Sequence, residues 1–558
     1  MNPVIVPGAA AAAALALIFF ILRALSARSR GFNKKLDAAP LTVPYTIPLV
    51  RSTFSFVFDG PNFFIRAARF CQGRWPLRVG LLNDEVYLVQ GQKNITSIFS
   101  NPKLTVTRAY GVVLKYCCGM DQKAVDVYVS DTSGSRERPI PGSSIPPNRR
   151  VGYHTHENLF HGLLGNGLGH TAERFDAAIK SSLEKAVPIG PSWTHVDDLT
   201  EFFEDHLGTA ILEALFGPLL LTETPGFHRT LWQYDKYIMS MAKRLPSWLI
   251  PEGYRLRDEV LRGIMKWHKQ ATELSENNAA DLGEGDPYWG SAMMRERHKM
   301  LLGIDEQDLR SVASTDLALI WASITNVVPS TMTLCTQLYS DNSLVTELRS
   351  SLSDSIQSES ESLQFNMDKI SKKPLLLSLY AETLRYGVQI HVPRCSPNQP
   401  LHIGKGVIQP DKLILINTAL AHTDDEVWNT RDGQYPLDTF WGRRFLVDPQ
   451  DPQSGPLKPS SAPYEFMMEQ MRVKDSDSTG EQFTVQGLEG IWIPYGGGQN
   501  ACPGRLLAKR IMLLTTAMMV TMFDVELLDP VPHFDSRRFG FGVRKPVTKV
   551  PFRIRRRC

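Results

Sequence analysis

The sequence predicts a mainly α-helical α+β protein, for three reasons. Helical hydrophobic periodicity dominates residues 157–276 and returns over residues 306–339 and 375–385. Runs with strand-like composition are few and short, as at residues 77–82 and 85–90. No period of about 20 to 50 residues repeats, which excludes a solenoid or a propeller. We therefore expect a large helix-rich body with a small amount of sheet.

Turn residues and prolines divide the chain into its expected elements. Asn83-Asp84 separates two β-prone runs and so predicts a hairpin, whereas Pro218 and Pro225 interrupt a helical pattern. Segments rich in Ser, Gly or Pro without periodicity are expected to be loops. In chain order we expect the hairpin at 77–90, a loop at 130–150, helices over 157–276, a polar break at 277–290, one long helix over 306–339, a polar insertion at 351–362, a helix at 375–385, strand pairs at 401–417 about Gln409-Pro410, a loop-rich segment at 448–482 and a C-terminal hairpin at 539–554.

The composition is that of an ordinary globular protein with 558 residues, 43% of them apolar and 21% charged. A net charge of +3 is too small to indicate a nucleic-acid partner. The seven cysteines contain no repeated Cys-x-x-Cys pair, so neither a disulfide framework nor a structural zinc site is expected. His156 and His161 are five residues apart, not four, so they do not form a zinc-protease helix. The globular part is expected to face the cytosol.

An uncharged, apolar run covers residues 4–22, and as a helix it would span about 28 Å, close to the thickness of a bilayer. Basic residues follow this run before the first acid, Asp37, so the positive-inside rule keeps the body of the protein cytoplasmic. We expect an N-terminal membrane anchor at residues 1–26, a basic, proline-rich linker at 27–50 and a catalytic domain at 51–558. A cleaved signal peptide is the alternative, but it would carry positive charge before the apolar run.

The most informative stretch is Tyr495-Gly-Gly-Gly-Gln-Asn-Ala-Cys502-Pro-Gly-Arg505, which precedes a helical run. Successive glycines permit backbone torsions closed to other residues and let the chain approach a flat ligand. A helix beginning at about Pro503 would direct backbone N–H groups at the sulfur and favour a thiolate. A thiolate in such a loop is the proximal ligand that a haem iron needs for cleaving an O–O bond. The alternative is a small apolar core cysteine after a glycine turn.

A second constellation involves three charged residues. Glu382 and Arg385 lie three residues apart and so share a helix face, a pairing that contributes only about 0.2–0.5 kcal/mol when exposed. The segment Phe440-Trp-Gly-Arg-Arg444-Phe445 supplies a further cation. We expect Glu382, Arg385 and Arg444 to form a buried network that holds the haem pocket and has a structural role.

Together these motifs resemble the cytochrome P450 superfamily across essentially the whole chain. Tyr495, Gly498, Cys502 and Gly504 match its haem signature, and the Glu-x-x-Arg pair precedes the cysteine as in that family. The resemblance implies the P450 fold, with a large helical lobe and a small β-rich lobe. It also implies haem b with an axial thiolate from Cys502.

A narrower resemblance is to the branch that contains bile-acid sterol hydroxylases and prostacyclin synthase. Trp321-Ala-Ser-Ile-Thr-Asn326-Val-Val-Pro329 is similar to the distal-helix motif of that branch, and Phe539-Gly-Phe-Gly-Val543 to its last substrate loop. Long Ser/Pro insertions are similar to those of fungal members. The resemblance implies a substrate pocket lined by Trp321, Ala322, Val388, Ile390, Phe541 and Val543.

Three departures from the general family pattern affect the site. Asn326-Val327 stands where an acid–threonine pair is usual, so the usual hydroxyl is missing. Thr325 or Ser323, or substrate and water, would have to replace it, and Pro329 would loosen the helix and admit water. We expect Thr325 and Asn326 to be the catalytic residues of this helix. Asn500 stands where an arginine is usual, which leaves Arg394 as the candidate partner of a haem propionate. No tryptophan lies between Trp75 and Trp193, so the family's Trp-x-x-x-Arg clamp is absent.

The resemblance implies a monooxygenase that hydroxylates a lipophilic small molecule, such as a terpenoid, a steroid or a polyketide-derived metabolite. It implies O2, electrons from NADPH through cytochrome P450 reductase, and a monomer anchored once in the endoplasmic reticulum membrane. Because prostacyclin synthase also lacks the distal threonine, a haem-thiolate isomerase or dehydratase that needs neither O2 nor reductase is an alternative. A membrane-tethered haem-binding sensor without turnover is another.

Overall fold

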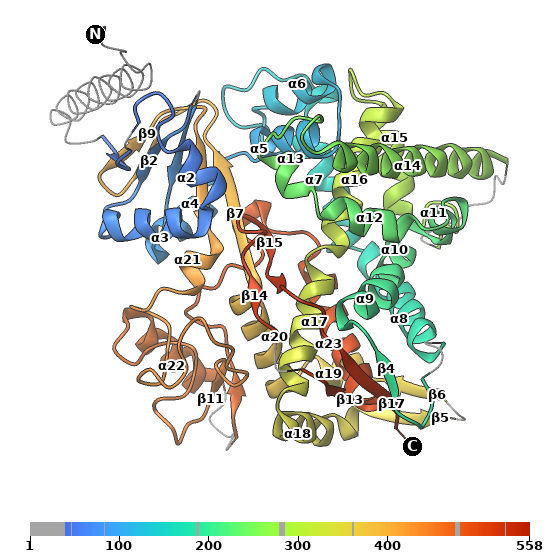
Figure 1. Ribbon diagram of the computed structural model, residues 1–558. Helices are drawn as coiled ribbons and strands as arrows, with labels where there is room; N and C mark the ends of the chain where they lie inside the picture. Colours follow the sequence, from blue (N-terminus) through green and yellow to red (C-terminus); the bar gives the residue numbers. More distant parts are fainter. Residues whose placement is uncertain are drawn as a thin grey trace, which may run out of the picture.

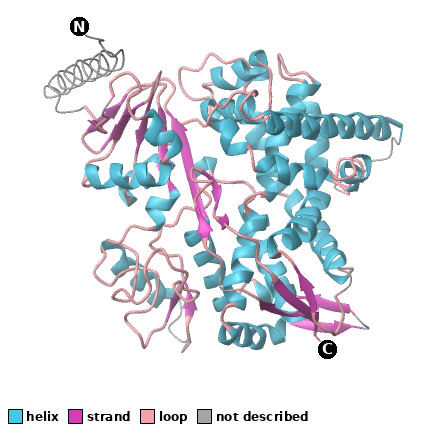
Figure 2. Cartoon of the chain, in the orientation of Figure 1, coloured by secondary structure: helices cyan, strands magenta, loops and turns pink. Residues whose placement is uncertain are grey.

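Helices form most of the structure, a computed structural model that describes residues 39–557 apart from 46, 83, 186–188, 278–284, 360–361, 475–479 and 530–531 (Figure 2). The predicted anchor at 1–26 lies outside the described residues. The α+β prediction is confirmed. The α-helices are α2 Thr53–Phe58, α3 Gly60–Cys71, α4 Gln92–Ser100, α5 Thr107–Val112, α6 Gln122–Ser130, α7 Val151–Leu163, α8 Gly167–Glu184, α9 Leu199–Phe203, α10 Thr209–Phe216, α11 Pro218–Glu223, α12 Phe227–Asp235, α13 Ile238–Ala242, α14 Pro251–Asn277, α15 Ala292–Leu302, α16 Leu309–Ile324, α17 Val327–Tyr339, α18 Asn342–Leu352, α19 Met367–Ile370, α20 Pro374–Gly387, α21 Thr418–His422, α22 Ala462–Lys474 and α23 Arg505–Met522.

The largest sheet has six strands and extends from the region of α2, α3 and α4 to the middle of the molecule (Figure 1). Its order is β1 Leu41–Thr42, β2 Leu77–Gly80, β3 Glu85–Leu88, β10 Leu413–Asn417, β7 Val388–Cys395 and β15 Phe541–Val543. The predicted hairpin is confirmed as the antiparallel pair β2–β3. Because β1 pairs with β2, the sheet begins inside the segment that the sequence suggested as a linker.

The C-terminal hairpin prediction is wrong, because the strands after residue 539 pair with distant partners. The strand β15 pairs with β7, and β17 Phe552–Arg556 lies between β13 Phe523–Leu527 and β4 Thr194–Val196. Phe552 and Ile554 are fully buried there, which a local hairpin would not achieve. Short pairs complete the strands: β14 Phe534–Asp535 with β16 Lys545–Pro546, β11 Leu446–Val447 with β12 Gln482–Phe483, and β5 Ile356–Glu359 with β6 Ser362–Phe365.

The strand prediction at 401–417 was correct in kind but wrong about the turn. The strands β8 Leu401–Ile403 and β9 Gly406–Ile408 form a hairpin around Gly404, whose φ of +55° lies in the left-handed region that favours glycine. The turn is therefore not at Gln409-Pro410. The strand β10 beyond it joins the large sheet instead.

The long helix predicted over 306–339 is two helices, α16 and α17, which run through the middle of the molecule (Figure 1). The first begins at Leu309, because the Asp308 side chain caps it by accepting a hydrogen bond from the Ser311 N–H at 2.7 Å. The two are separated at Thr325 and Asn326, since Pro329 has no N–H to donate to the Thr325 carbonyl. Among the described residues, 309–339 is the only helical stretch apolar enough to span a membrane, and 72% burial marks it as core.

Candidate active site

The Cys502 loop depends on glycine at the positions where it passes α4. Gly496 and Gly498 have φ of +67° and +68°. A Cβ on Gly498 would lie 2.0 Å from the Phe99 carbonyl oxygen, and one on Gly497 would lie 2.1 Å from the Phe99 ring. The loop closes with a hydrogen bond of 3.0 Å from the Cys502 N–H to the Tyr495 carbonyl. Cys502 is the exposed cysteine of the described six, the other five being buried.

The electrostatics of Cys502 differ from the expectation. Although Cys502 is exposed toward the cavity, the surrounding protein desolvates the thiol and raises its pKa, and this effect outweighs the Gly504 N–H and the Arg505 charge, which both lower it. The helix α23 begins at Arg505, with Gly504 as its N-cap, two residues later than predicted. The protein alone therefore does not favour the thiolate, so the expectation was wrong. A metal cation bound to the sulfur would lower the pKa of the thiol and so favour its deprotonated form.

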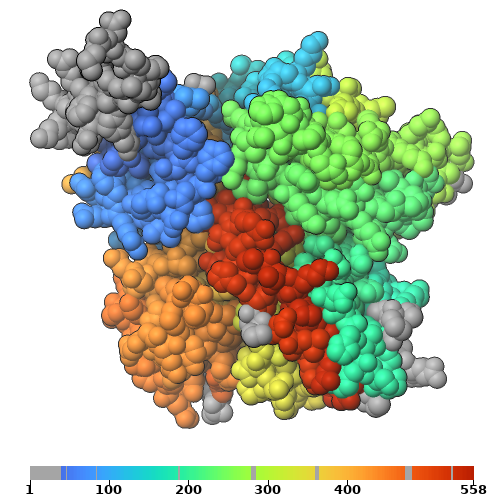
Figure 3. All heavy atoms as spheres, viewed as in Figure 1, coloured from blue at the N-terminus to red at the C-terminus, as the bar shows by residue number. Residues whose placement is uncertain are grey.

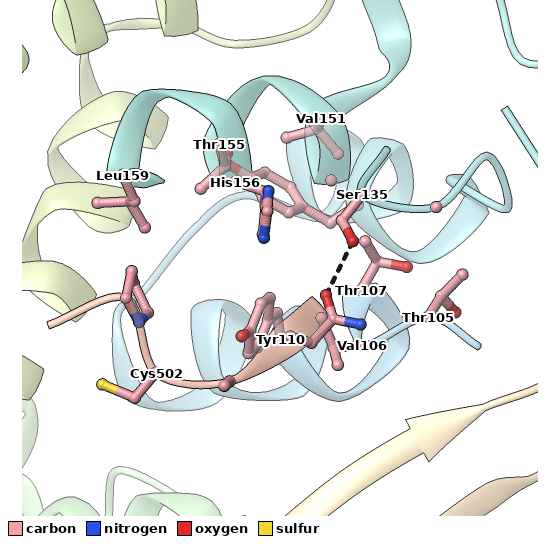
Figure 4. A pocket seen from close by; sticks show the side chains of 16 residues that line it. Thr105, Val106, Thr107, Tyr110, Ser135, Val151, Thr155, His156, Leu159 and Cys502 are labelled. Carbon is pink, nitrogen blue, oxygen red and sulfur yellow. Dashed lines mark hydrogen bonds between the residues drawn. The ribbon is translucent and has the colours of Figure 1, made fainter. Parts of the chain in front are cut away.

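A cavity of about 110 Å³ adjoins the Cys502 loop (Figure 4). Its walls are α5, α7 and the loop that carries Ser135, and Cys502 lies at its edge. The Ser135 hydroxyl donates to Asn500 Oδ1 at 3.0 Å, so Asn500 is tied to this wall. His156 Nε2 lies 2.9 Å from the Gln499 carbonyl oxygen, while its buried Nδ1 has no hydrogen-bond partner among the described residues.

Sequence reasoning missed most of this wall. It set His156 aside together with the rejected zinc motif, and it did not single out Tyr110 or Ser135. Tyr110 faces the cavity from α5 (Figure 4). None of these side chains belongs to a motif with characteristic spacing, so only the packing of α5 and α7 against the Cys502 loop brings them together.

Arg394 reaches the same loop from β7. Its Nη2 donates to the Gly497 carbonyl at 2.7 Å and its Nη1 to the Pro393 carbonyl at 2.8 Å. The guanidinium lies 5.3 Å from the centre of the Phe99 ring. Burial lowers the pKa of Arg394 to about 10, so it remains a cation at neutral pH. Among the described residues no carboxylate lies within ion-pair distance, which leaves this buried charge available for an anionic group.

These features fit a haem. The Cys502 thiol is accessible beside a cavity. Its loop has glycines where it passes α4. The buried Arg394, which has no acidic partner among the described residues, contacts the same loop. The Tyr495 hydroxyl lies 3.0 Å from the Tyr380 hydroxyl and thereby ties the loop to α20.

Four predicted site residues lie at the end of α16 or directly after it, and they differ in burial: Trp321, Ala322, Thr325 and Asn326. Ala322 is exposed although its helix crosses the interior, and Asn326, four residues later, is half-buried. The Oδ1 of Asn326 has no hydrogen-bond partner among the described residues. Trp321 and Thr325 are instead buried, and the Thr325 hydroxyl donates to the Trp321 carbonyl at 2.8 Å. This geometry presents Asn326, and not the Thr325 hydroxyl, on the more open face.

The structure brings the remaining predicted pocket residues onto one strip. In the antiparallel register, Phe541 lies opposite Ile390, and Val543 lies opposite Val388. All four side chains share one face of the β7–β15 pair, because alternate residues of a strand point to the same side. Val388 and Val543 are buried, while Ile390 and Phe541 are half-buried. The indole N–H of Trp321 is engaged elsewhere, because it donates a hydrogen bond to Asp235 Oδ1 at 2.7 Å.

Glu382, Arg385 and Arg444 form one fully buried network. Arg385 is bidentate to Glu382, with Nε and Nη2 at 2.6 and 2.8 Å from the two carboxylate oxygens. Arg444 Nε lies 3.2 Å from the same carboxylate, and the Trp441 N–H donates to it at 3.0 Å. Burial alone would raise the pKa of Glu382, but the two arginine charges outweigh it and lower the pKa. The network therefore joins α20 to the segment before β11.

Comparison with known proteins identifies the family. No protein-family model matches the chain. The cytochrome P450 monooxygenase efuG of Hormonema carpetanum is 31% identical over 532 residues, which cover 92% of this chain and 90% of that protein. The chain belongs to the cytochrome P450 family. A second fungal P450 monooxygenase, fsoE of Humicola fuscoatra, is 31% identical over 549 residues, covering 96% of this chain and 90% of the relative.

Sterol hydroxylases are more distant relatives of this cytochrome P450. The 5-beta-cholestane-3-alpha,7-alpha-diol 12-alpha-hydroxylase of Sus scrofa is 27% identical over 415 residues, covering 71% of this chain and 74% of that enzyme. The predicted resemblance to a fungal P450 related to sterol hydroxylases is thus confirmed. The protein is a P450 monooxygenase.

Proposed function

We propose that this P450 hydroxylates a terpenoid, steroid-like or polyketide-derived metabolite. The apolar strip of Val388, Ile390, Phe541 and Val543 supports a lipophilic substrate, because ligand pockets in proteins are lined mainly by apolar side chains. The relatives support the substrate class, since they include fungal P450 monooxygenases and enzymes named as sterol hydroxylases.

The observation that carries the proposal is the accessible thiol of Cys502 on its glycine loop. Cys502 would hold the iron of haem b, and Arg394 would pair with a propionate. When bound, the haem supplies the oxygen-activating redox chemistry that protein side chains lack. Tyr495, Gly498 and Gly504 would shape the loop around it. The buried network would hold α20 and the segment before β11 together and take no part in the chemistry: Glu382, Arg385 and Arg444.

Asn326 would position a water molecule for proton delivery. Its amide can donate and accept hydrogen bonds, and its Oδ1 is unpaired among the described residues. Asn326 lies at the interruption between α16 and α17, where its φ of −109° departs from the regular helical value of about −63°. Thr325 would act through the backbone, because its hydroxyl is engaged with the Trp321 carbonyl.

The protein would work as a monomer at the endoplasmic reticulum membrane, with residues 1–26 as the anchor and NADPH–cytochrome P450 reductase as the electron donor. Exposed apolar side chains support contact with a membrane: Leu49, Phe54, Phe58, Trp248 and Leu249. The two segments that carry them are neighbours, since Lys243 lies 5.5 Å from the centre of the Phe58 ring. The blue and green parts of the chain also adjoin on one face in Figure 3.

The test is turnover of candidate metabolites by the full-length protein in vesicles with reductase, NADPH and ¹⁸O2. One ¹⁸O atom in the product, and no product when reductase or O2 is left out, is the expected result. Product formed without reductase would favour an isomerase. Haem incorporation without product from an extract of lipophilic metabolites would favour a sensor, and either outcome would overturn the proposal.

A further inference from the structure

A carbonyl is left without its helical donor where α16 meets α17. In a continuous helix the N–H of residue 329 would donate to the Thr325 carbonyl, but Pro329 has no N–H. A buried carbonyl without a partner is costly, about 1–3 kcal/mol. Arg538 supplies the donor, since its Nη1 lies 3.2 Å from the Thr325 carbonyl oxygen. The replacement comes from a residue more than two hundred positions further along the chain.

Arg538 is itself held by a buried anion. Its Nη1 also donates to Asp235 Oδ2 at 3.0 Å, and Lys545 Nζ lies 3.0 Å from the same oxygen. Burial would raise the pKa of Asp235, but the charges of Lys545 and Arg538 outweigh it and lower the pKa, so the carboxylate stays ionised. Asp235 Oδ1 accepts from Trp321 Nε1. One carboxylate at the end of α12 therefore joins α16 to the loop before β15.

One more acid, Glu204, lies next to the cluster of Asp235, Arg538 and Lys545. Lys545 Nζ also lies 3.7 Å from Glu204, whose pKa burial raises to about 7. Glu204 begins a short π-helix, Glu204–Gly208, beside the cluster. Glu204 therefore pairs with Lys545, whereas Arg538 pairs with Asp235, which is the anion that orients the guanidinium.

Gly542 leaves room for the guanidinium. A Cβ on Gly542 would lie 2.9 Å from Arg538 Nε and 3.1 Å from its Cζ. Nε and Nη2 of Arg538 have no hydrogen-bond partner among the described residues, although the side chain is only 9% exposed. Burying these N–H groups unpaired costs free energy, which the Nη1 contacts with Asp235 and Thr325 offset.

We propose that Arg538 is a positioning residue of the oxygenation site, replacing the N–H that Pro329 lacks and thereby fixing the interruption that orients Asn326. Removing the guanidinium releases the Thr325 carbonyl, and the backbone at Thr325 and Asn326 then moves between several conformations. Asn326 no longer holds its water in one place. The effect on product rests on the proposed role of Asn326, whereas the effect on the backbone does not.

The experiment is a mutant cycle on the full-length protein, made of Arg538→Gln, Pro329→Ala and the double variant, with Arg537→Gln as the matched control. Arg537 is the neighbouring arginine, and its side chain is 71% exposed. Two quantities are measured: hydrogen–deuterium exchange of amides 322–331, and product formed per NADPH consumed for each mole of protein with an intact carbon monoxide difference spectrum. The first needs no substrate, so it separates failure of this inference from failure of the proposed substrate class.

We expect Arg538→Gln to speed exchange at 326–331 about tenfold or more, because a hydrogen bond from a charged group is lost. Product per NADPH should fall severalfold. In the Pro329→Ala background, where residue 329 can donate to the Thr325 carbonyl, Arg538→Gln should have much smaller effects on both. Arg537→Gln should change neither. A merely structural role predicts equal effects in both backgrounds, and that outcome would overturn the proposal.

If Arg538→Gln does not yield folded protein, Gly542→Ala serves in its place. The added methyl group displaces the guanidinium while leaving its charge in the chain. Faster exchange at 326–331 with lower product per NADPH is expected again. Unchanged exchange there in a folded Gly542→Ala protein would contradict the inference.

Discussion

His422 Nε2 accepts a hydrogen bond of 3.0 Å from the backbone N–H of Ile493, two residues before Tyr495. The end of α21 thus holds the start of the Cys502 loop through a neutral imidazole. Burial, followed by the charge of Arg385, lowers the pKa of His422 to about 3. Protonation would remove the acceptor that Ile493 uses, so this contact requires the uncharged ring.

The low pKa of His422 leads us to expect that acid lowers the free energy of unfolding. The unfolded chain binds a proton near pH 6.5, whereas folded His422 does not until about pH 3. Stability should therefore fall as pH drops through about 6.5 toward 3, by up to about 1.4 kcal/mol per pH unit for this group. Urea unfolding at pH 7.5 and 5.0 checks this. His422→Gln should reduce the difference between the two pH values, and the same replacement at His161, which is exposed, should not. An unchanged difference in His422→Gln would contradict the assignment.

Glu382→Gln should destabilise the protein by about 3–5 kcal/mol, because it leaves Arg385 and Arg444 as buried cations without a charged partner. Urea unfolding measures the change, and haem content after expression should fall with it. The control is Glu481→Gln. Glu481 pairs with Arg443 at a partly exposed site, so its loss should cost about 1 kcal/mol or less. Equal costs for the two variants would show that the buried network does not support the fold.

Cys502→Ala should abolish the carbon monoxide difference band of a thiolate-ligated haem, because no other described cysteine is exposed. Cys395→Ala is the matched control. That residue ends β7 and is buried, and burial raises the pKa of its thiol to about 12, so it is not available as a thiolate. The band should survive in Cys395→Ala. Its survival in Cys502→Ala would exclude Cys502 as the axial ligand.

Trp248 should lie in the lipid when the full-length protein is placed in vesicles, since 79% of its surface is exposed next to other apolar side chains. Brominated phosphatidylcholine should quench part of the tryptophan fluorescence, and Trp248→Ser should lose much of the quenched part. Trp193→Ser serves as the control, because the Trp193 ring contacts the guanidinium groups of Arg553 and Arg555. Equal quenching in parent and Trp248→Ser would argue against contact between this surface and the membrane.

The parts of the site that the sequence predicts are those carried by short motifs. Glu382 and Arg385 share a turn of helix, and the glycines before Cys502 require a particular backbone, so both are readable locally. Arg444 could be assigned to the same network because an arginine-rich segment lies between them and Cys502. The structure brings these residues into contact as expected.

The parts that the sequence does not predict depend on which distant segments meet. Pro329 indicates that a helix will be disturbed, but not which residue will satisfy the Thr325 carbonyl. Arg538 does so only because β15 pairs with β7 rather than with its own neighbours. Tyr110 and Ser135 likewise reach the cavity through the packing of α5 and of the loop after α6. For the same reason the strands of residues 539–554 looked like a hairpin.

One face of β7 connects the two halves of the site. Val388 and Ile390 belong to the apolar strip, Val392 lies 3.3 Å from where a Cβ on Gly496 would be, and Arg394 contacts Gly497. Four residues of strand span about 13 Å, so backbone geometry fixes the separation between Ile390 and Arg394. Exchanging Val388 or Ile390 for another apolar residue would reshape the pocket and leave Arg394 in place. Inserting a single residue between them would turn one group away from the other, because a one-residue slip reverses the face of every side chain beyond it.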